Sequence, residues 1–177
     1  MITCYIDIDI EPAPSCYRIQ PDVVQRVMER LLHCLGLAER ELSLRFVSES
    51  EIQQLNFQYR NRNQPTDVLS FPQQEWDSPL CLGDDIESVS SPYPQPLGDI
   101  VISLEQAEKN AKDIGHGLDR ETCFLLIHSL LHLCGHDHEL PKEEAAMCEQ
   151  QQLLLRALQE QDPAPWLNMV TRKEDSA

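Results

Sequence analysis

The chain has 177 residues, of which 41% are hydrophobic and 25% are charged, so that one domain can bury a core of its own. The formal net charge of -16 argues against a general coat for nucleic acid or membranes, because such a coat needs a basic surface. The first residues lack a signal-peptide pattern, no apolar run is long enough to span a bilayer, and the seven cysteines include no CxxC pair. We therefore expect a cytoplasmic protein with reduced thiols.

The first predicted elements are a strand, a helix and a second strand. Apolar residues recur at every second position over 2–10, which is typical of a strand. They recur at helical spacing over 23–35, and Gly36 ends this predicted helix. A second alternating stretch, over 42–46, predicts the next strand.

A capping-box pattern opens the following helix, because Ser48 precedes Glu51 by three residues. A short apolar run over 66–71 predicts the third strand. The segment 73–97 is rich in proline, serine and acidic residues, and we expect a solvated acidic loop there. The helix that begins after Ser48 is predicted to have an apolar face made of Ile52, Leu55 and Tyr59.

A fourth strand is predicted over 98–102, and another capping pattern follows it, with Ser103 three residues before Gln106. Gly115 is expected to end the helix that begins there. The inward face of this helix is predicted to comprise Leu104, Ala107, Ala111 and Ile114.

Helices alone follow, over about 119–134 and 142–158. Alternating strands and helices that give way to helices predict an α+β fold, with a single mixed four-stranded sheet and about five helices packed on it. We expect one catalytic metal-binding domain at 1–160 and an extended or frayed C-terminal tail at 161–177.

The stretch 128–138 reads His-Ser-Leu-Leu-His-Leu-Cys-Gly-His-Asp-His. His128 and His132 are four residues apart in a predicted helix, so they share one face. Their apolar neighbours predict a buried helix, in which imidazoles need partners. Gly135 is expected to turn the chain back. Three neutral imidazoles at such spacings suit a tetrahedral zinc ion with one position open, which is the pattern of a catalytic site.

The third ligand is predicted to be His138, although His136 competes for the position, because a residue directly after the glycine has less chain with which to reach the metal. Cys134 is expected to pack in the core, since it lies about 200° around the helix from His132. Asp137 either orients a ligand or caps the turn. The opposing interpretation, hydrogen-bonded core histidines, is disfavoured by the combined spacing.

The spacing HxxxHxxGxxH also occurs in the metzincin proteases, in which a Glu after the first His is the general base. Ser129 stands at that position here, and its hydroxyl is no base at neutral pH without help. The sequence therefore keeps the ligand spacing and lacks the peptidase base. This disfavours a peptidase and leaves metal-assisted hydrolysis open.

Four stretches of the chain, taken together, resemble one known family. They are Tyr59-Arg60, 65–72, 97–103 and 128–138. In this order they resemble the YbeY family of endoribonucleases, the bacterial factors for ribosomal RNA maturation, whose histidine signature is close to HGxLHLxGYDH. The resemblance covers most of the chain from about residue 42 to residue 155. Ser129 replaces the usual Gly and His136 the usual aromatic residue; Ser129 is expected beside the metal, where it would alter access.

The resemblance implies one zinc ion per chain, held by His128, His132 and His138, and an essential arginine at Arg60. It implies cleavage of single-stranded RNA in the maturation of small-subunit ribosomal RNA and in ribosome quality control, with the ribosomal subunit or its proteins as partners. An arginine suits bidentate binding of phosphate, and Arg60 with Arg62 supplies the local positive charge that an acidic chain needs. Without the resemblance, Arg60 would be read as a surface salt-bridge residue.

Two other functions remain open at this point. One is a metal-dependent peptidase or amidohydrolase. The other is a non-enzymatic ribosome-assembly factor with a structural zinc, whose acidic surface docks onto basic ribosomal proteins. The general base is also open between metal hydroxide, Asp137, His136 and none of these. His116, between two glycines, is expected to be a loop residue outside the chemistry.

Overall fold

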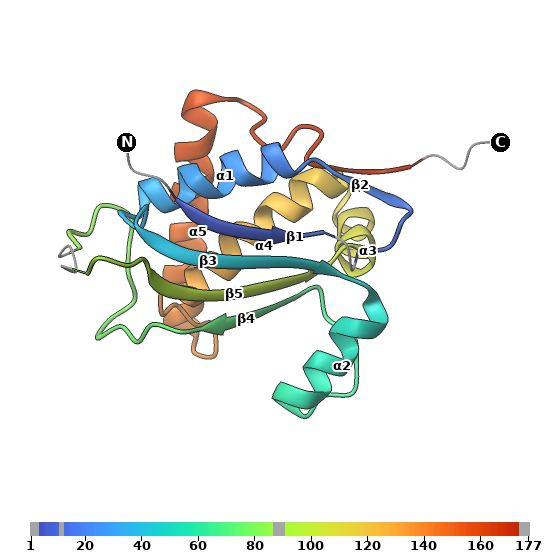
Figure 1. The fold of residues 1–177 in the computed structure, drawn as a ribbon, viewed down its shortest axis with the longest axis horizontal. Helices are drawn as coiled ribbons and strands as arrows, with labels where there is room; N and C mark the ends of the chain where they lie inside the picture. Colours follow the sequence, from blue (N-terminus) through green and yellow to red (C-terminus); the bar gives the residue numbers. More distant parts are fainter. Residues whose placement is uncertain (1–3, 11–12, 87–90, 174–177) are drawn as a thin grey trace.

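The computed structural model describes residues 4–10, 13–86 and 91–173. Its main sheet has the strand order β1-β3-β5-β4. Strands β1 (Tyr5–Asp9), β3 (Arg40–Val47) and β5 (Gln95–Ser103) are parallel, and β4 (Val68–Pro72) is antiparallel to β5 at the edge (Figure 1). The predicted mixed four-stranded sheet is confirmed. Of the first predicted strand, residues 2 and 3 lie outside the described residues.

The predicted number of helices, about five, is also confirmed. No helix in the described ranges is both long and apolar enough to cross a membrane. The helices are α1 (Pro21–Cys34), α2 (Glu49–Arg60), α3 (Leu104–Ile114), α4 (Leu118–Leu133) and α5 (Pro141–Gln161).

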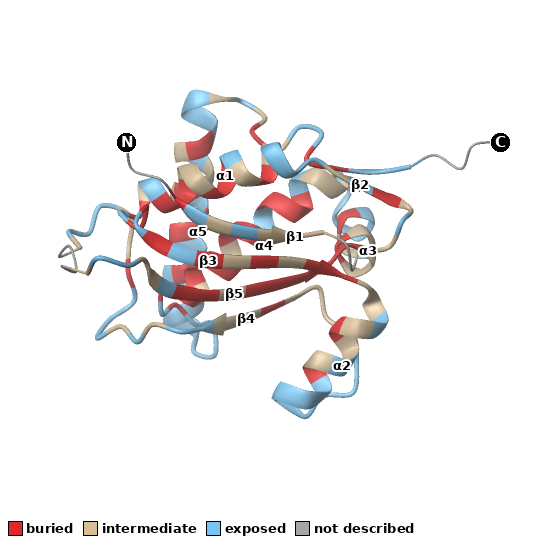
Figure 2. Cartoon of the chain, viewed as in Figure 1, coloured by how far each residue is buried: buried red, intermediate tan, exposed pale blue. Residues whose placement is uncertain are grey.

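The sheet divides the core into a large and a small part, because successive residues of a strand face opposite sides. Ile100 and Ile102 of β5 join the large cluster, to which α1, α4 and α5 contribute, whereas Val101 joins a small cluster under α2 with Ile52. Buried residues accordingly follow β3, β5 and the inner faces of the helices (Figure 2). Helix α4 is thus enclosed, as predicted for the helix that carries the histidine motif.

Two predicted helix starts are confirmed by their hydrogen bonds. The side chain of Ser48 accepts from the backbone N–H of Glu51, and that of Ser103 accepts from the N–H of Gln106. Two residues assigned to the inward faces are instead exposed: Tyr59 is 59% and Ile114 66% accessible. Both lie in the last turn of their helix, where Tyr59 still makes an edge contact with Phe71 of β4, with ring centroids 5.0 Å apart.

The segment after β4 is solvated only in part: its acidic residues in the described ranges are exposed, as predicted, but other residues pack on the domain. The indole N–H of Trp76 donates to the carbonyl of Leu133 at 2.9 Å, and the N–H of Leu80 donates to the carbonyl of Cys134, also at 2.9 Å. Leu80 is buried. This part of the loop therefore packs on the C-terminal end of α4, which a reading of its charged and proline-rich composition did not predict.

The end of the chain also packs on the domain. Strand β6 (Val170–Arg172) pairs antiparallel with β2 (Tyr17–Ile19) in a second, two-stranded sheet. Met169 is fully buried, and both Tyr17 and Arg172 bond to the carboxylate of Glu108. The segment predicted as a tail is extended over β6 and held by these contacts, so it contributes to the packing of the domain before it.

Candidate metal centre

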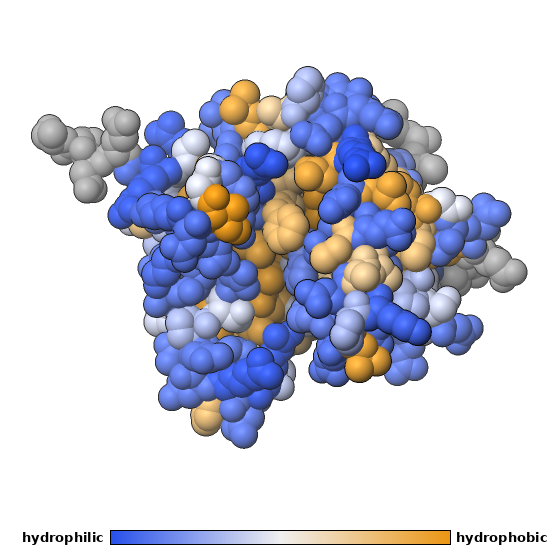
Figure 3. Space-filling view, turned by 180° about the vertical axis from the view of Figure 1, so that it is seen from behind, coloured by the Kyte–Doolittle hydropathy of each residue, from blue (hydrophilic) through white to orange (hydrophobic). Residues whose placement is uncertain are grey.

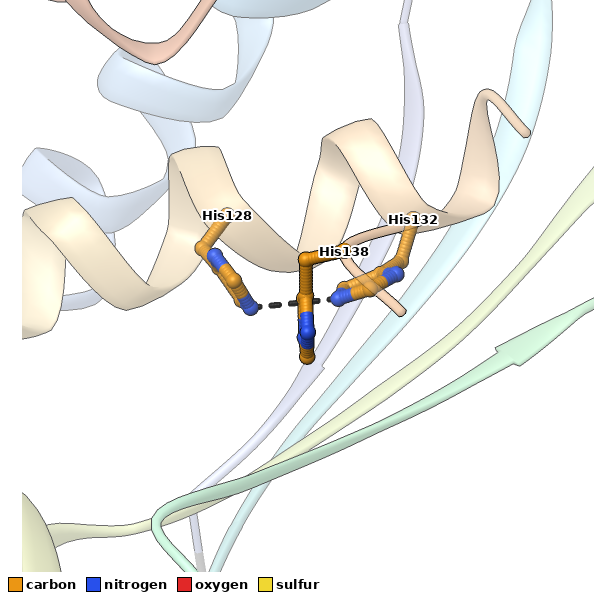
Figure 4. A group of neighbouring side chains, drawn as sticks. All are labelled: His128, His132 and His138. Atoms are coloured by element: carbon orange, nitrogen blue, oxygen red, sulfur yellow. Dashed lines mark hydrogen bonds between the residues drawn. The ribbon is translucent and has the colours of Figure 1, made fainter. Parts of the chain in front are cut away.

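Three histidine side chains meet at the C-terminal end of α4 (Figure 4). His128 and His132 lie one turn apart on α4, and His138 follows in the next turn of the chain. One ring nitrogen of each lies within 4.8 Å of those of the other two, and the Nε2 atoms of His128 and His132 are 3.1 Å apart. The rings of the first two are partly buried and that of His138 is exposed, so the group opens to solvent on the side of His138.

A tight turn after α4 brings His138 to the group. Gly135 has a φ of 89°, in the left-handed region that glycine adopts at little cost. The N–H of His136 then donates to the carbonyl of Leu131 at 3.0 Å. The ring of His136 turns away from the group and is buried, with its Nε2 2.7 Å from the carbonyl oxygen of Leu80. Of the two competing histidines, the geometry therefore favours His138 as the third ligand.

Burial keeps the first two imidazoles neutral. Desolvation, with the neighbouring His132 and His138, lowers the pKa of His128 to about 4. Desolvation also lowers the pKa of His132, and Arg60 adds to that effect, whereas the hydrogen bond to the His136 carbonyl and the charge of Asp137 oppose it. A neutral imidazole is the form that binds metal ions, so these two side chains are in the binding form at neutral pH.

The orientation of His132 is fixed by its own turn. Its Nδ1 lies 3.0 Å from the carbonyl oxygen of His136, which can only accept, so Nδ1 carries the proton and Nε2 keeps its lone pair. This arrangement, in which the outer nitrogen donates to a carbonyl and the inner nitrogen is free, is typical of metal-binding histidines. The chemistry of the donors and their convergence fit a metal ion.

An open pocket of about 740 Å³ adjoins the histidines. It contains two arginines, Arg60 at the end of α2 and Arg62 just beyond it. Both are exposed, and among the described residues neither side chain forms an ion pair, so the salt-bridge reading of Arg60 finds no partner there. The residues that line the pocket are Arg60, Arg62, Ser70, Pro72, His132, Gly135, His136, Asp137, His138 and Glu139.

The position of both arginines depends on a buried asparagine. Asn61 ends α2 in the left-handed conformation, with a φ of 55°. Asn56, which is 3% exposed, accepts the N–H of Arg62 on its carbonyl, and its amide donates to the carbonyl of Gln64 at 2.8 Å. These bonds tie the turn after α2, which carries Arg62, to the helix that ends at Arg60.

One face of the molecule, seen from behind, is largely hydrophilic, with hydrophobic residues in a furrow near its middle and in further patches, mostly to the right of the furrow (Figure 3). Arg60 and Arg62 bring two positive charges to the pocket, whose lining also includes Asp137 and Glu139, on a chain whose net charge is -16. Such a placement is what an anionic substrate requires of an acidic protein.

Ser129 does not stand at the entrance to the group, contrary to the expectation that it alters access. Its side chain is fully buried, and its hydroxyl donates to the carbonyl of Leu125 one turn earlier, at 2.6 Å. Cys134 is fully buried as expected. The carboxylate of Asp137 accepts the N–H of His138 at 2.7 Å, which is the turn-capping alternative of its two predicted roles.

His116 packs at the start of α4, away from the pocket lining. Its Nε2 lies 2.5 Å from a carboxylate oxygen of Glu121, which is 3% exposed. A buried carboxylate needs such a partner. The pair thus holds the loop before α4, in agreement with the expected role of His116 outside the chemistry.

The sequence reading missed one residue in direct contact with a predicted ligand. Gln151 of α5 lies 2.6 Å from Nδ1 of His128 through its side-chain amide, and it is 8% exposed. The available signal was its place in an apolar helical stripe, four residues after Met147 and three before Leu154. A polar residue on a buried face needs a hydrogen-bond partner. The sequence pattern predicts that such a partner exists, but it does not predict which residue it is.

Comparison with known proteins points to one family. The model of the family described as Endoribonuclease YbeY matches residues 17–159. The Endoribonuclease YbeY of Listeria innocua is 42% identical over 146 residues, which cover 77% of this chain and 88% of the relative. That of Clostridioides difficile is 33% identical over 157 residues, with 86% and 97% covered. A solution structure of a Thermotoga maritima protein is similar with a TM-score of 0.57 at 25% identity, over 97% of this chain and 98% of that one.

Proposed function

This chain belongs to the Endoribonuclease YbeY family and is a metal-dependent endoribonuclease, and we propose that it uses zinc to cut single-stranded RNA. The observation that supports this proposal most strongly is that one ring nitrogen from each of the three histidines lies within 4.8 Å of the others. The group adjoins a pocket that Arg60 lines. We propose His128, His132 and His138 as the ligands of one zinc ion per chain. Three imidazoles with an open side are typical of catalytic rather than structural zinc.

The role proposed for the zinc ion follows from its charge. When bound, it supplies Lewis acidity toward a phosphate oxygen and makes a nearby water more acidic. His128 and His132 contribute by being neutral at pH 7 and held in direction by their own hydrogen bonds. His132 illustrates this, since its outer nitrogen is already committed to the carbonyl of His136.

Arg60 is proposed to bind the scissile phosphate. Phosphodiester cleavage adds negative charge to the phosphate oxygens in the transition state, and a guanidinium can bind two of them at once. Because Arg60 has no ion-pair partner among the described residues, its donors are available to such a substrate. Arg62 is proposed to bind a neighbouring phosphate of the same strand.

Proton transfer is proposed to fall to an activated water or to Asp137, which lines the pocket. Asp137 and Glu139 are both exposed and line it. His136 is disfavoured as a general base, because its ring is buried and its Nε2 is bonded to the carbonyl of Leu80. Of the candidates that the sequence left open, an activated water and Asp137 are retained.

The biological setting is proposed from family membership. We propose that the substrate is a precursor of small-subunit ribosomal RNA, that the protein also acts in ribosome quality control, and that it contacts the ribosomal subunit or its proteins in the cytoplasm. We propose that residues 1–160 are the catalytic unit. Residues 161–177 are proposed to be an extension that stabilises this unit through the pairing of β6 with β2.

The test combines metal analysis with an RNA cleavage assay. The wild type is expected to bind one zinc per chain and to nick single-stranded RNA. His128→Ala is expected to lose both properties, and Arg60→Ala to keep the metal and lose most of the cleavage. The exposed residues of α1 provide matched controls, His33→Ala and Arg26→Ala, which are expected to behave as the wild type. Zinc-loaded protein that leaves RNA intact at every ionic strength would contradict the proposal.

A further inference from the structure

Two consecutive glutamines lie on the buried side of α5. Gln150 is 9% and Gln151 8% exposed. A buried amide is costly unless its donor and acceptor find partners. The side-chain oxygen of Gln150 accepts the N–H of Leu82 at 2.8 Å, which holds the loop that packs on the end of α4. The amide of Gln151 reaches the metal centre itself, 2.6 Å from Nδ1 of His128.

We propose that Gln151 is a positioning residue, whose amide sets which ring nitrogen of His128 is free to bind metal and which reverses its direction when the metal binds. The inference rests on the proposed zinc site and deepens it. Gln151 has no part in the chemistry of RNA, and it acts only through His128.

The hydrogen bonds around His128 define one proton arrangement. The amide NH₂ group of Gln151 is oriented toward Nδ1 of His128, and an amide nitrogen only donates. Nδ1 therefore accepts, and the proton of the neutral ring lies on Nε2. That proton points at Nε2 of His132, 3.1 Å away (Figure 4). The proton that His132 carries on Nδ1 is donated to the carbonyl of His136. Each of these three hydrogen bonds thus has one donor and one acceptor.

Metal binding requires the opposite arrangement at His128. Its Nε2 faces the other two histidines, so this atom must lose its proton to present a lone pair. The ring stays neutral only if Nδ1 gains a proton, and the number of protons on His128 is then unchanged. Nδ1 becomes a donor, and it now needs an acceptor where the amide NH₂ group was.

Gln151 can meet both needs because its amide has a donor and an acceptor of the same size. A half-turn of the amide places its oxygen against Nδ1 and keeps the same contact. His132 needs no such adjustment, because the carbonyl of His136 accepts in either state. Gln151, whose amide can present either a donor or an acceptor, thus lies beside His128, the ligand whose ring proton must change nitrogen.

Three substitutions separate this role from simple packing. Gln151→Met keeps the approximate volume and removes the acceptor, Gln151→Glu keeps an acceptor only, and Gln152→Met changes the exposed neighbour on the same helix as a control. Zinc affinity is measured by competition with a chromophoric chelator. We expect a loss of about 10- to 100-fold for Gln151→Met, affinity close to the wild type for Gln151→Glu, and no change for Gln152→Met.

The tautomer of His128 is a second readout that packing would not move. In ¹⁵N-labelled protein, the proton of the His128 ring is expected on Nε2 without metal and on Nδ1 after zinc is added. This measurement uses the wild type, so it decides the question even if Gln151→Met fails to fold. A ring proton on the same nitrogen in both states would overturn the reversal of the amide.

The remaining outcomes are also decisive. Equal zinc affinity of Gln151→Met and the wild type, or a loss in Gln151→Glu as large as in Gln151→Met, would overturn the positioning role while leaving the zinc site intact. Failure of the zinc site itself looks different, because the wild type and His128→Ala would then bind zinc equally poorly. The two failures are thereby distinguished.

Discussion

The lowered pKa of His128 makes a prediction about the stability of the metal-free protein. The ring has an ordinary pKa of 6.5, which applies in the unfolded chain, and a pKa of about 4 in the folded chain. Between these two pH values the unfolded chain binds a proton that the folded chain does not. Stability that is fully present above pH 6.5 is therefore lost as the pH falls through 6.5 toward 4.

The size of the loss follows from the two pKa values. From about pH 7.5 to about pH 5, the difference in proton binding by His128 lowers the free energy of unfolding by about 2 kcal/mol. The pKa of His132 is lowered as well, so that His132 adds to the loss with the same sign. Above about pH 5, ordinary carboxylates contribute little to the pH dependence of the free energy of unfolding. The loss between about pH 7.5 and about pH 5 therefore reports mainly on histidines.

Urea unfolding of chelator-treated protein at several pH values measures this loss directly. His128→Gln replaces the imidazole by a side chain that does not titrate, and its stability is expected to fall by about 2 kcal/mol less than that of the wild type over the same window. Any packing cost of the substitution is present at every pH, so it cancels in the slope. Parallel curves for the two proteins would refute the argument that burial holds His128 neutral.

Three further substitutions test the packing around the site. At Gly98, which has a φ of 150°, a Cβ atom would collide with the carbonyl oxygen of Phe71 and lie 2.8 Å from the side chain of Leu133, so Gly98→Ala should lower the free energy of unfolding by about 3 kcal/mol; a change in melting temperature below about 2 °C would contradict this. Trp76→Phe removes one hydrogen bond to the carbonyl of Leu133 and should destabilise by about 1 kcal/mol in the same assay. Ser129→Ala should leave RNA cleavage unchanged, because the hydroxyl is bonded inside α4, and a tenfold loss of rate would assign it a catalytic role.

The parts of the site that were predictable are those encoded locally. The three proposed ligands fall within the eleven positions 128–138. Helical periodicity, with one glycine that turns the chain back, is enough to bring all three together. The strands of the main sheet were predictable for a similar reason, since the alternation of apolar residues over 2–10 and 42–46 and the apolar run over 66–71 are visible within each segment. Both signals depend on neighbours in the sequence.

The parts that were missed depend on contacts between distant segments. Strand β2 has three residues and no pattern of its own, and it exists because β6 pairs with it from the other end of the chain. Trp76 lies in a segment of loop composition, and its packing is decided by a carbonyl at the end of α4. Gln151 could be recognised as a buried polar residue, but its partner is 23 positions away.

The division between local and distant contacts has a consequence for the metal centre. The spacing of the three ligands is local, yet their orientation is not: His128 is held from α5 by Gln151, and His132 is held by the carbonyl of His136. The ring of His136 is in turn bonded to Leu80. A peptide that contains 128–138 alone would therefore keep the donors and lose their orientation. Because the folded chain supplies that orientation before the metal arrives, metal binding is expected to stabilise the packing of α5 and of the Leu80 loop together, as linkage between binding and folding requires.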